Sequence, residues 1–187
     1  MRIAGSAPDN LVGGTLAGDA NTIAFNEGDG VSIRSLGNFA ESTGNSILRN
    51  SIFGNIDLFP DGLGIDLGDD GPTPNDEDDA DDGPNNLQNK PNLTSAENAS
   101  GETTVRGSLN SRPNQKFKVL FFSNSPGGSE GEKYIGQKNV TTGANGNTGA
   151  FSFRPENKVP LGRNITATAT RSSTGDTSEF AGPEEVV

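Results

Sequence analysis

The chain has 187 residues, of which 29% are hydrophobic and 21% are charged, which is enough for one or two domains with small cores. It contains no Cys and no His, which excludes disulfides, thiolate nucleophiles, Ser-His triads and most transition-metal sites. The net charge of −11 argues against nucleic acid and anionic membranes as partners. No apolar run approaches the roughly 18 residues of a membrane span, so we expect no membrane insertion. The 26 Gly and 11 Pro residues favour an all-β, turn-rich architecture.

The first 70 residues repeat a short pattern of apolar and Asn positions. Residues 21–26 and 45–50 both read N-x-I-x-x-N and lie 24 residues apart. Residues 30–33 and 64–67 both read G-[VI]-x-[IL] and lie 34 residues apart. Short apolar strands with Asn and Gly at the corners are typical of a parallel β-helix, whose coils stack about 4.8 Å apart and whose Asn side chains form ladders. We therefore predict such coils over residues 1–70, in preference to a set of β-hairpins.

A solenoid of so few coils needs covered ends. We expect the acidic stretch at residues 71–90 to cap one end. The chain begins within the repeat pattern and shows no signal peptide, so we expect it to be a piece of a longer protein. Missing coils or a neighbouring chain would then cover the other end, and self-association through this open β-helix end is expected.

Beyond residue 90 the pattern changes to longer alternating stretches separated by turn clusters. Several short strands with turns every 8–12 residues suggest an Ig-like β-sandwich over residues 91–187, although the Cys and Trp of antibody domains are absent. The expected core residues are Phe117, Phe121, Phe151, Phe153 and Ile165. The predicted strands are residues 92–96, 103–109, 116–123, 133–141, 150–154, 165–171 and 177–181.

An acidic stretch separates the two patterns. Eleven acids lie between Asp57 and Asp82, while the fourteen acids elsewhere equal the fourteen bases of the chain. Such a run is usually solvated, but here Gly and Pro are spaced as turn formers and Asn residues add neutral oxygens. Ca²⁺ takes six to eight oxygen ligands of these kinds. We therefore predict a calcium-binding junction loop at residues 71–90, and the alternative is a solvated acidic linker.

Four stretches of the sequence carry a family resemblance. They are GDANTIAFNEGDGVSI, GIDLGDDGPTPNDEDDADDGPNNLQNKPNLTSA, FFSNSPGGSEGEKYIGQKNVTTGANGNTGAFSF and ITATATRSSTGDTSEF. The chain resembles large bacterial cell-surface and secreted proteins that join right-handed parallel β-helix repeats to a C-terminal Ig-like domain. The resemblance covers nearly the whole chain, and the second stretch is its most specific part. It implies an all-β fold, with a short right-handed parallel β-helix followed by an immunoglobulin-like β-sandwich, and an extracellular or cell-surface location.

The resemblance also implies which residues hold the metal. The family's acidic-loop pattern falls on seven residues, which are the candidate Ca²⁺ ligands: Asp66, Asp70, Asn75, Asp76, Asp79, Asp81 and Asn85. Four further acids lie beyond that pattern: Asp69, Glu77, Asp78 and Asp82.

The favoured function is a non-catalytic extracellular module for adhesion, display or spacing, which contacts a polysaccharide or another surface protein. The first alternative is a carbohydrate-binding module, with contacts from Arg34, Arg49, Phe25, Phe39, Phe53 and Phe59. The second is a β-helix polysaccharide lyase or glycosidase, for which Asp57 and Asp66 are a conceivable carboxylate pair. We expect no enzyme, because so few coils leave little groove for a polymer.

Overall fold

The protein is all-β. A computed structural model describes residues 1–35, 41–56 and 62–187. The strands are β1 (Arg2–Ala4), β2 (Leu11–Gly13), β3 (Thr22–Ala24), β4 (Val31–Arg34), β5 (Ser46–Leu48), β6 (Ser51–Phe53), β7 (Ile65–Leu67), β8 (Asn92–Ala99), β9 (Glu102–Ser108), β10 (Lys116–Asn124), β11 (Lys133–Thr141), β12 (Phe151–Phe153), β13 (Asn164–Arg171) and β14 (Glu184–Glu185). Short 3₁₀ helices are η1 (Ala17–Asp19), η2 (Glu77–Asp79) and η3 (Pro84–Leu87). No helix in these described ranges is long and apolar enough to cross a membrane.

The N-terminal strands pair in parallel. β1, β4 and β7 form one sheet, with Ile3 opposite Ile33 and Val31 opposite Ile65. β2 pairs with β5, and β3 pairs with β6. Two-residue hairpin turns cannot join parallel strands, so the hairpin alternative is excluded for β1–β7. The predicted 34-residue offset is confirmed by the pairing of Val31 with Ile65.

Asn side chains at the strand ends form ladders, but not in the predicted register. The sequence pattern predicts an offset of 24 residues, whereas Asn21 donates to Asn50 and Asn26 donates to Asn55, each 29 residues away. The predicted offset is wrong because residues 50–55 carry a third copy of the pattern, which overlaps the second at Asn50. The pairing of β3 with β6 selects this third copy.

A small apolar core lies between the parallel strands. Its buried members are Ile3, Val31, Ile33, Ile47, Ile52, Ile65 and Leu67. The helix η3 lies against β4 and β7, and its Leu87 packs on this core. Asn85 of η3 also continues a ladder, because Asn10 donates to Asn45 and the Asn45 N–H donates to Asn85. The segment after β7 therefore connects the N-terminal region to the rest of the chain and, through η3, also contributes to the core and the Asn ladder of that region.

The C-terminal strands are longer and antiparallel. They form a four-stranded sheet in the order β11-β10-β13-β14 and a three-stranded sheet in the order β12-β9-β8. Buried residues from both sheets form one apolar cluster, in which Phe121 stacks on Phe153 with ring centroids 4.1 Å apart. All five predicted core residues are buried, so that prediction is confirmed.

Six of the seven predicted C-terminal strands are present, and β11 has the predicted bounds. The seventh, at residues 177–181, is not a strand. This segment runs beside β13 and is joined to it by isolated backbone hydrogen bonds, such as the one from the Ala181 N–H to the Ala167 carbonyl. Its side chains are used elsewhere, since the Thr177 hydroxyl accepts a hydrogen bond from the Ile47 N–H of β5. This segment therefore serves as a contact between the two regions.

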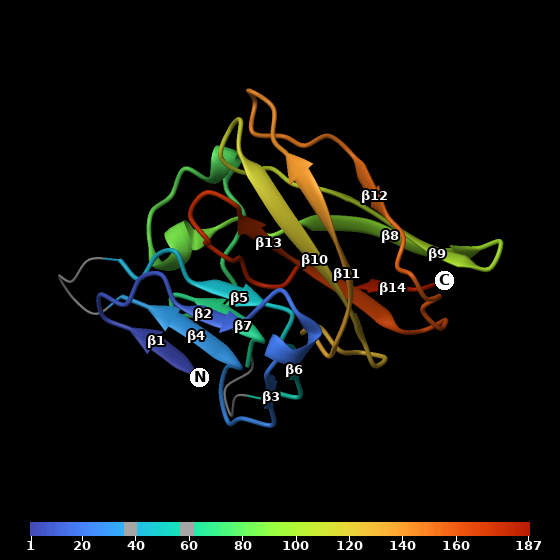
Figure 1. Cartoon of the computed structure of the whole chain (residues 1–187), viewed down its shortest axis with the longest axis horizontal. Coiled ribbons are helices and arrows are strands. Elements are labelled where there is room, and N and C mark those ends of the chain that lie inside the picture. The colour runs from blue at the N-terminus through green and yellow to red at the C-terminus, as the bar shows by residue number, and fades with distance from the viewer. Residues whose placement is uncertain (36–40, 57–61) are drawn as a thin grey trace.

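The two regions are joined by more than the chain that connects them. Ile52 of β6 and Gly131 exchange two backbone hydrogen bonds of 2.8 and 2.9 Å. The buried Asp176 accepts a hydrogen bond from the Gly44 N–H at 2.7 Å and pairs with Arg171 at 2.9 Å. Figure 1 shows the green segment that carries η2 and η3 beside both sets of strands. This segment is where the predicted metal ligands are concentrated.

Candidate metal site

Three carboxylates meet around η2. Asp76 precedes this helix, Asp79 ends it and Asp81 follows it, and one oxygen of each lies within 4.8 Å of the others. The turn uses positive φ angles of 59° at Asp78 and 56° at Asp79, which Asp adopts more readily than most residues. The Oδ2 atom of Asp76 accepts hydrogen bonds from the N–H groups of Ala80, at 2.9 Å, and Asp81, at 3.2 Å. These bonds close the turn and bring the carboxylates together.

Two residues outside the carboxylate cluster, Asn89 and Ser111, hold this turn in place. Asn89 accepts from the Asp76 N–H at 3.1 Å and donates through its amide to the Asp76 carbonyl at 2.8 Å. The Asn89 N–H donates to Oδ1 of Asp79 at 2.7 Å, and the Ser111 hydroxyl donates to Oδ2 of Asp79 at 2.9 Å. Asp79 is fully buried, so its carboxylate is fixed from both sides.

Two carboxylate oxygens of the cluster lack partners. The Oδ1 atoms of Asp76 and Asp81 are buried and accept no hydrogen bond from the part of the chain that the structure describes. A buried carboxylate oxygen without a partner is costly, because it has lost water and gained nothing in return. A cation bound between these oxygens would remove that cost.

The charge of the cluster is only partly compensated. Burial, together with the negative charges of Asp76 and Asp79, raises the pKa of Asp81 to about 6. Burial also raises the pKa of Asp79, against the hydrogen bonds from Asn89 and Ser111. The Arg112 guanidinium opposes both shifts without cancelling them. The site therefore favours either protonation or a bound cation.

The cluster borders a hollow of about 470 Å³. Its lining includes four of the seven predicted ligands: Asp70, Asn75, Asp76 and Asp81. Ca²⁺ completes its shell of six to eight oxygens with carbonyls and waters where carboxylates are few, and this hollow has room for such waters. The donor set consists of oxygen atoms, which suits a hard cation.

Two other predicted acids lie apart from the three clustered carboxylates. Asp66 is buried on β7, and its oxygens accept from the N–H groups of Asp69, at 2.9 Å, and Gly71, at 3.0 Å. Burial raises the pKa of Asp66 to about 6. Asp70 is exposed at the rim of the hollow. Asp66 therefore closes a turn, and only Asp70 is placed to approach an ion from outside.

The two predicted amide ligands hold backbone groups. Asn75 donates to the Lys90 carbonyl and accepts from the Lys90 N–H, at 2.8 and 2.9 Å. Asn85 is buried, and its amide binds the Asn45 backbone and the Thr177 carbonyl. Asn75 therefore closes the loop on its own end, and Asn85 ties it to the two regions on either side of it.

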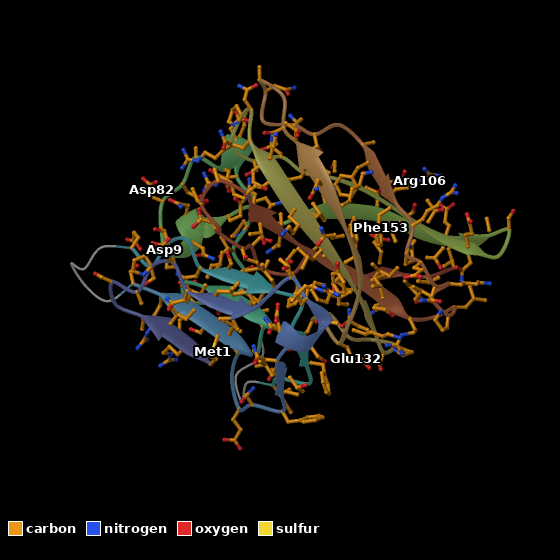
Figure 2. All side chains as sticks on the ribbon, viewed as in Figure 1. Met1, Asp9, Asp82, Arg106, Glu132 and Phe153 are labelled. Atoms are coloured by element: carbon orange, nitrogen blue, oxygen red, sulfur yellow. The ribbon has the colours of Figure 1, made fainter. Side chains whose placement is uncertain are left out.

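The acids beyond the family pattern differ strongly in environment. Asp69 pairs with Arg2 at 3.0 Å and Arg34 at 2.9 Å, and it accepts from Ser32 at 2.6 Å. Burial alone would raise the pKa of Asp69, but the Ser32 hydrogen bond and the two guanidinium charges hold it below its usual range. Asp82 points outward, as Figure 2 shows; its side chain is 88% exposed, and its ion pair with Arg112 is long, at 3.8 Å, so the pair is well screened by solvent. Asp82 is therefore a suitable reference acid for experiments on the cluster.

The residues predicted for sugar binding or catalysis that the structure describes are mostly engaged in contacts with other side chains. Arg34 is engaged by Asp69, and Arg49 lies over the Tyr134 ring at 4.3 Å. Phe25 is 77% exposed and packs edge-to-face on Phe53, with ring centroids 5.3 Å apart. Three of the predicted residues lie outside the described ranges: Phe39, Asp57 and Phe59.

Sequence reasoning missed the residues that support the cluster from outside it. Asn89, Ser111 and Arg112 contact the acids directly or through their backbone. The sequence assigned residues 110–114 only to a turn, and no local pattern connects them with Asp79. Asn89 carried a weak signal, since it lies within the most specific stretch of the resemblance, at residues 64–96.

No protein-family model matches the sequence, and no curated protein matches it either. Similarity therefore assigns neither a family nor an activity. The functional argument depends on the geometry of the junction and on the surfaces around it.

Proposed function

We propose that the chain is a non-catalytic extracellular module of the adhesion or display type, whose junction binds Ca²⁺ through Asp76, Asp79 and Asp81. In this proposal, the first 70 residues are the end of a right-handed parallel β-helix and residues 91–187 are an Ig-like β-sandwich. Parallel pairing and Asn ladders support the first assignment. Two antiparallel sheets that share one apolar cluster support the second.

The observation that carries the metal proposal is the pair of buried, unpartnered Oδ1 atoms on Asp76 and Asp81. Both lie in the same carboxylate cluster as Asp79, whose oxygens each keep a lone pair after accepting one hydrogen bond. Ca²⁺ accepts irregular oxygen shells of this kind, whereas Mg²⁺ requires near-octahedral geometry and keeps its waters. The cluster therefore favours Ca²⁺ over Mg²⁺.

The position of the cluster explains what the ion would do. Asn89 and Ser111 tie the carboxylates to the segments that precede β8 and follow β9, and η3 packs on β4 and β7. An ion that binds only this folded arrangement would stabilise both regions by mass action. In an extracellular medium a Kd on the order of 10⁻⁴–10⁻³ M is sufficient for occupancy.

Thermal melts test the proposal. We expect CaCl₂ at a hundredfold excess over Kd to raise Tm by roughly 5–10 °C relative to EDTA, with a smaller effect of MgCl₂. Asp81→Asn removes one negative charge and an unpartnered carboxylate oxygen, and should abolish most of the shift. Asp82→Asn makes the same change of charge at an exposed position and should retain it.

Metal analysis of the dialysed protein completes the test. Stoichiometric Ca²⁺ in the wild type and its loss in Asp81→Asn are expected. Identical melting curves in EDTA and CaCl₂, with no bound metal, would show that the junction is a solvated acidic loop. A full calcium shift in Asp81→Asn would exclude this cluster as the site.

A further inference from the structure

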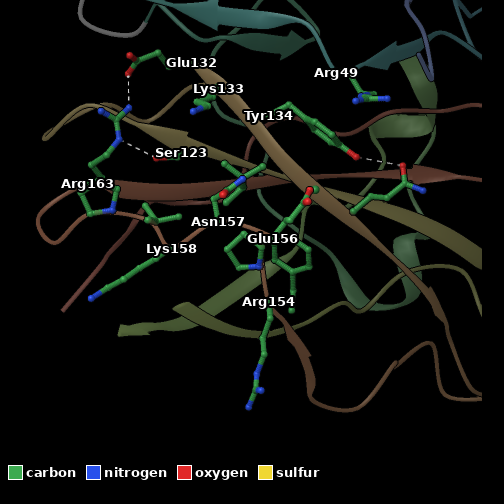
Figure 3. Close-up of a pocket in the computed structure, with 17 residues that line it drawn as sticks. Arg49, Ser123, Glu132, Lys133, Tyr134, Arg154, Glu156, Asn157, Lys158 and Arg163 are labelled. Carbon is green, nitrogen blue, oxygen red and sulfur yellow. Dashed lines mark hydrogen bonds and ion pairs between the residues drawn. The ribbon is translucent and has the colours of Figure 1, made fainter. Parts of the chain in front are cut away.

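The residues that line a groove of about 700 Å³ are distant in sequence from the metal cluster. It runs between β11 and the segment that connects β12 to β13, and it shares no lining residue with the metal cluster. Its volume falls within the range of pockets that bind small ligands. Figure 3 shows basic side chains around its edge, with Asn157 and Glu156 between them.

The groove has the opposite charge to the rest of the molecule. Its lining carries five basic and two acidic side chains, whereas the chain as a whole has a net charge of −11. Lys133 on β11 and Lys158 on the opposite segment are exposed and have no ion pair within the described ranges. Positive charge gathered in a concave surface of an acidic protein attracts anions selectively.

The other basic side chains of the groove are already engaged, and Arg154 pairs with Glu102 at 2.9 Å. Arg163 pairs with Glu132 at 3.2 Å and donates to the Ser123 hydroxyl at 2.8 Å, as the dashed lines in Figure 3 show. Arg49 lies over the Tyr134 ring at 4.3 Å. These contacts fix the walls of the groove, so the two lysines remain as the groups free to bind a ligand.

We infer that this groove binds an acidic oligosaccharide, whose carboxylates pair with Lys133 and Lys158. The polar lining favours a sugar over an acidic peptide. Asn157 and Glu156 are both exposed in the groove, and the Glu156 carboxylate, which has no partner in the described structure, can accept hydrogen bonds from a ligand. An acidic sugar carries hydroxyl donors beside each carboxylate, whereas a run of acidic residues has only its backbone N–H groups as donors.

Calorimetric titration with oligogalacturonate at low salt, in EDTA, tests this inference. EDTA removes calcium, so the result does not depend on the junction site and failure here leaves the metal proposal intact. We expect saturable binding that weakens as salt screens the charges. The fully methyl-esterified oligomer has the same hydroxyls without the charge and should bind at least roughly tenfold more weakly.

A pair of double variants provides the matched control. Lys133→Gln with Lys158→Gln should weaken binding roughly tenfold, which corresponds to about 1.4 kcal/mol. Lys116→Gln with Lys138→Gln changes the net charge equally outside the groove and should bind as the wild type does. Unchanged melting temperatures would establish that all variants are folded.

Four results would overturn the inference. They are no binding at low salt, equal binding of the methyl ester, equal loss in both double variants, and tighter binding of polyglutamate than of oligogalacturonate. The last result would identify an acidic protein segment as the ligand of the groove.

Discussion

The two regions of this protein stabilise β-structure in different ways. In the N-terminal region the strands have three or four residues and pair in parallel. In the C-terminal region β8, β10, β11 and β13 have eight or nine residues and pair antiparallel. Apolar burial follows this division, because the C-terminal cluster contains aromatic pairs and the buried N-terminal cluster contains only Ile, Val and Leu.

The comparison shows how a region with a small core compensates. Buried Asn side chains contribute to the stability of this region. Asn45, Asn50 and Asn55 are at most 5% exposed, and each accepts a hydrogen bond from the Asn of the neighbouring coil. Buried polar groups stabilise a fold only when they are fully hydrogen-bonded. The N-terminal region should therefore be sensitive to substitutions that remove these Asn side chains.

The largest effect is expected in the aromatic core. Phe121 is fully buried and stacks on Phe153, so Phe121→Ala should lower the free energy of unfolding by about 3–5 kcal/mol. Phe25→Ala is the control, because Phe25 is 77% exposed and should cost far less. Chemical denaturation measures both. Similar losses for the two variants would contradict the assignment of the main core to the C-terminal region.

A smaller but distinct effect is expected in the ladder. Asn50 accepts from both the N–H and the amide of Asn21 and donates to the Val12 carbonyl at 2.9 Å. Asn50→Ala leaves these groups unpaired and should cost about 1–3 kcal/mol in denaturation experiments. Asn21→Ala removes only the exposed end of one bond and should cost less. Equal costs would show that the ladder is not a cooperative part of the fold.

The smallest effect concerns pH. Asp81 has a folded pKa of about 6, above its value in the unfolded chain, so the folded state binds more protons between these two values. The calcium-free protein should therefore gain stability as pH falls from 7.5 to 5, and Asp66 acts in the same direction. Thermal melts should show a smaller rise in Asp81→Asn than in Asp82→Asn. If Tm rises equally in both variants as pH falls, general charge repulsion, and not the cluster, causes the effect.

Much of the backbone was predictable from local pattern. Alternation in the C-terminal half located six strands, because each strand there buries one face on a common core. The N-terminal repeat predicted short strands but gave the wrong ladder offset. Two overlapping copies of N-x-I-x-x-N share Asn50, and only the backbone pairing decides between them.

The metal-ligand prediction was harder because it depends on distant residues. Asp76, Asp79 and Asp81 come together through a local turn, which a sequence can indicate. Asp66 and Asn85 have the same chemistry, yet their oxygens are occupied by backbone N–H groups. No local pattern distinguishes an acid that closes a turn from one whose oxygen remains unpaired.

The segment at residues 175–179 has a consequence for synthesis. Gly175, Thr177 and Glu179 supply acceptors to Ser46, Ile47 and Leu67, which lie in the first part of the chain. Domains usually fold in the order in which the ribosome releases them. Here β5 and β7 lack these partners until more than a hundred further residues have been released. Nascent chains halted before residue 175 should therefore expose β5 and β7 to proteases and chaperones.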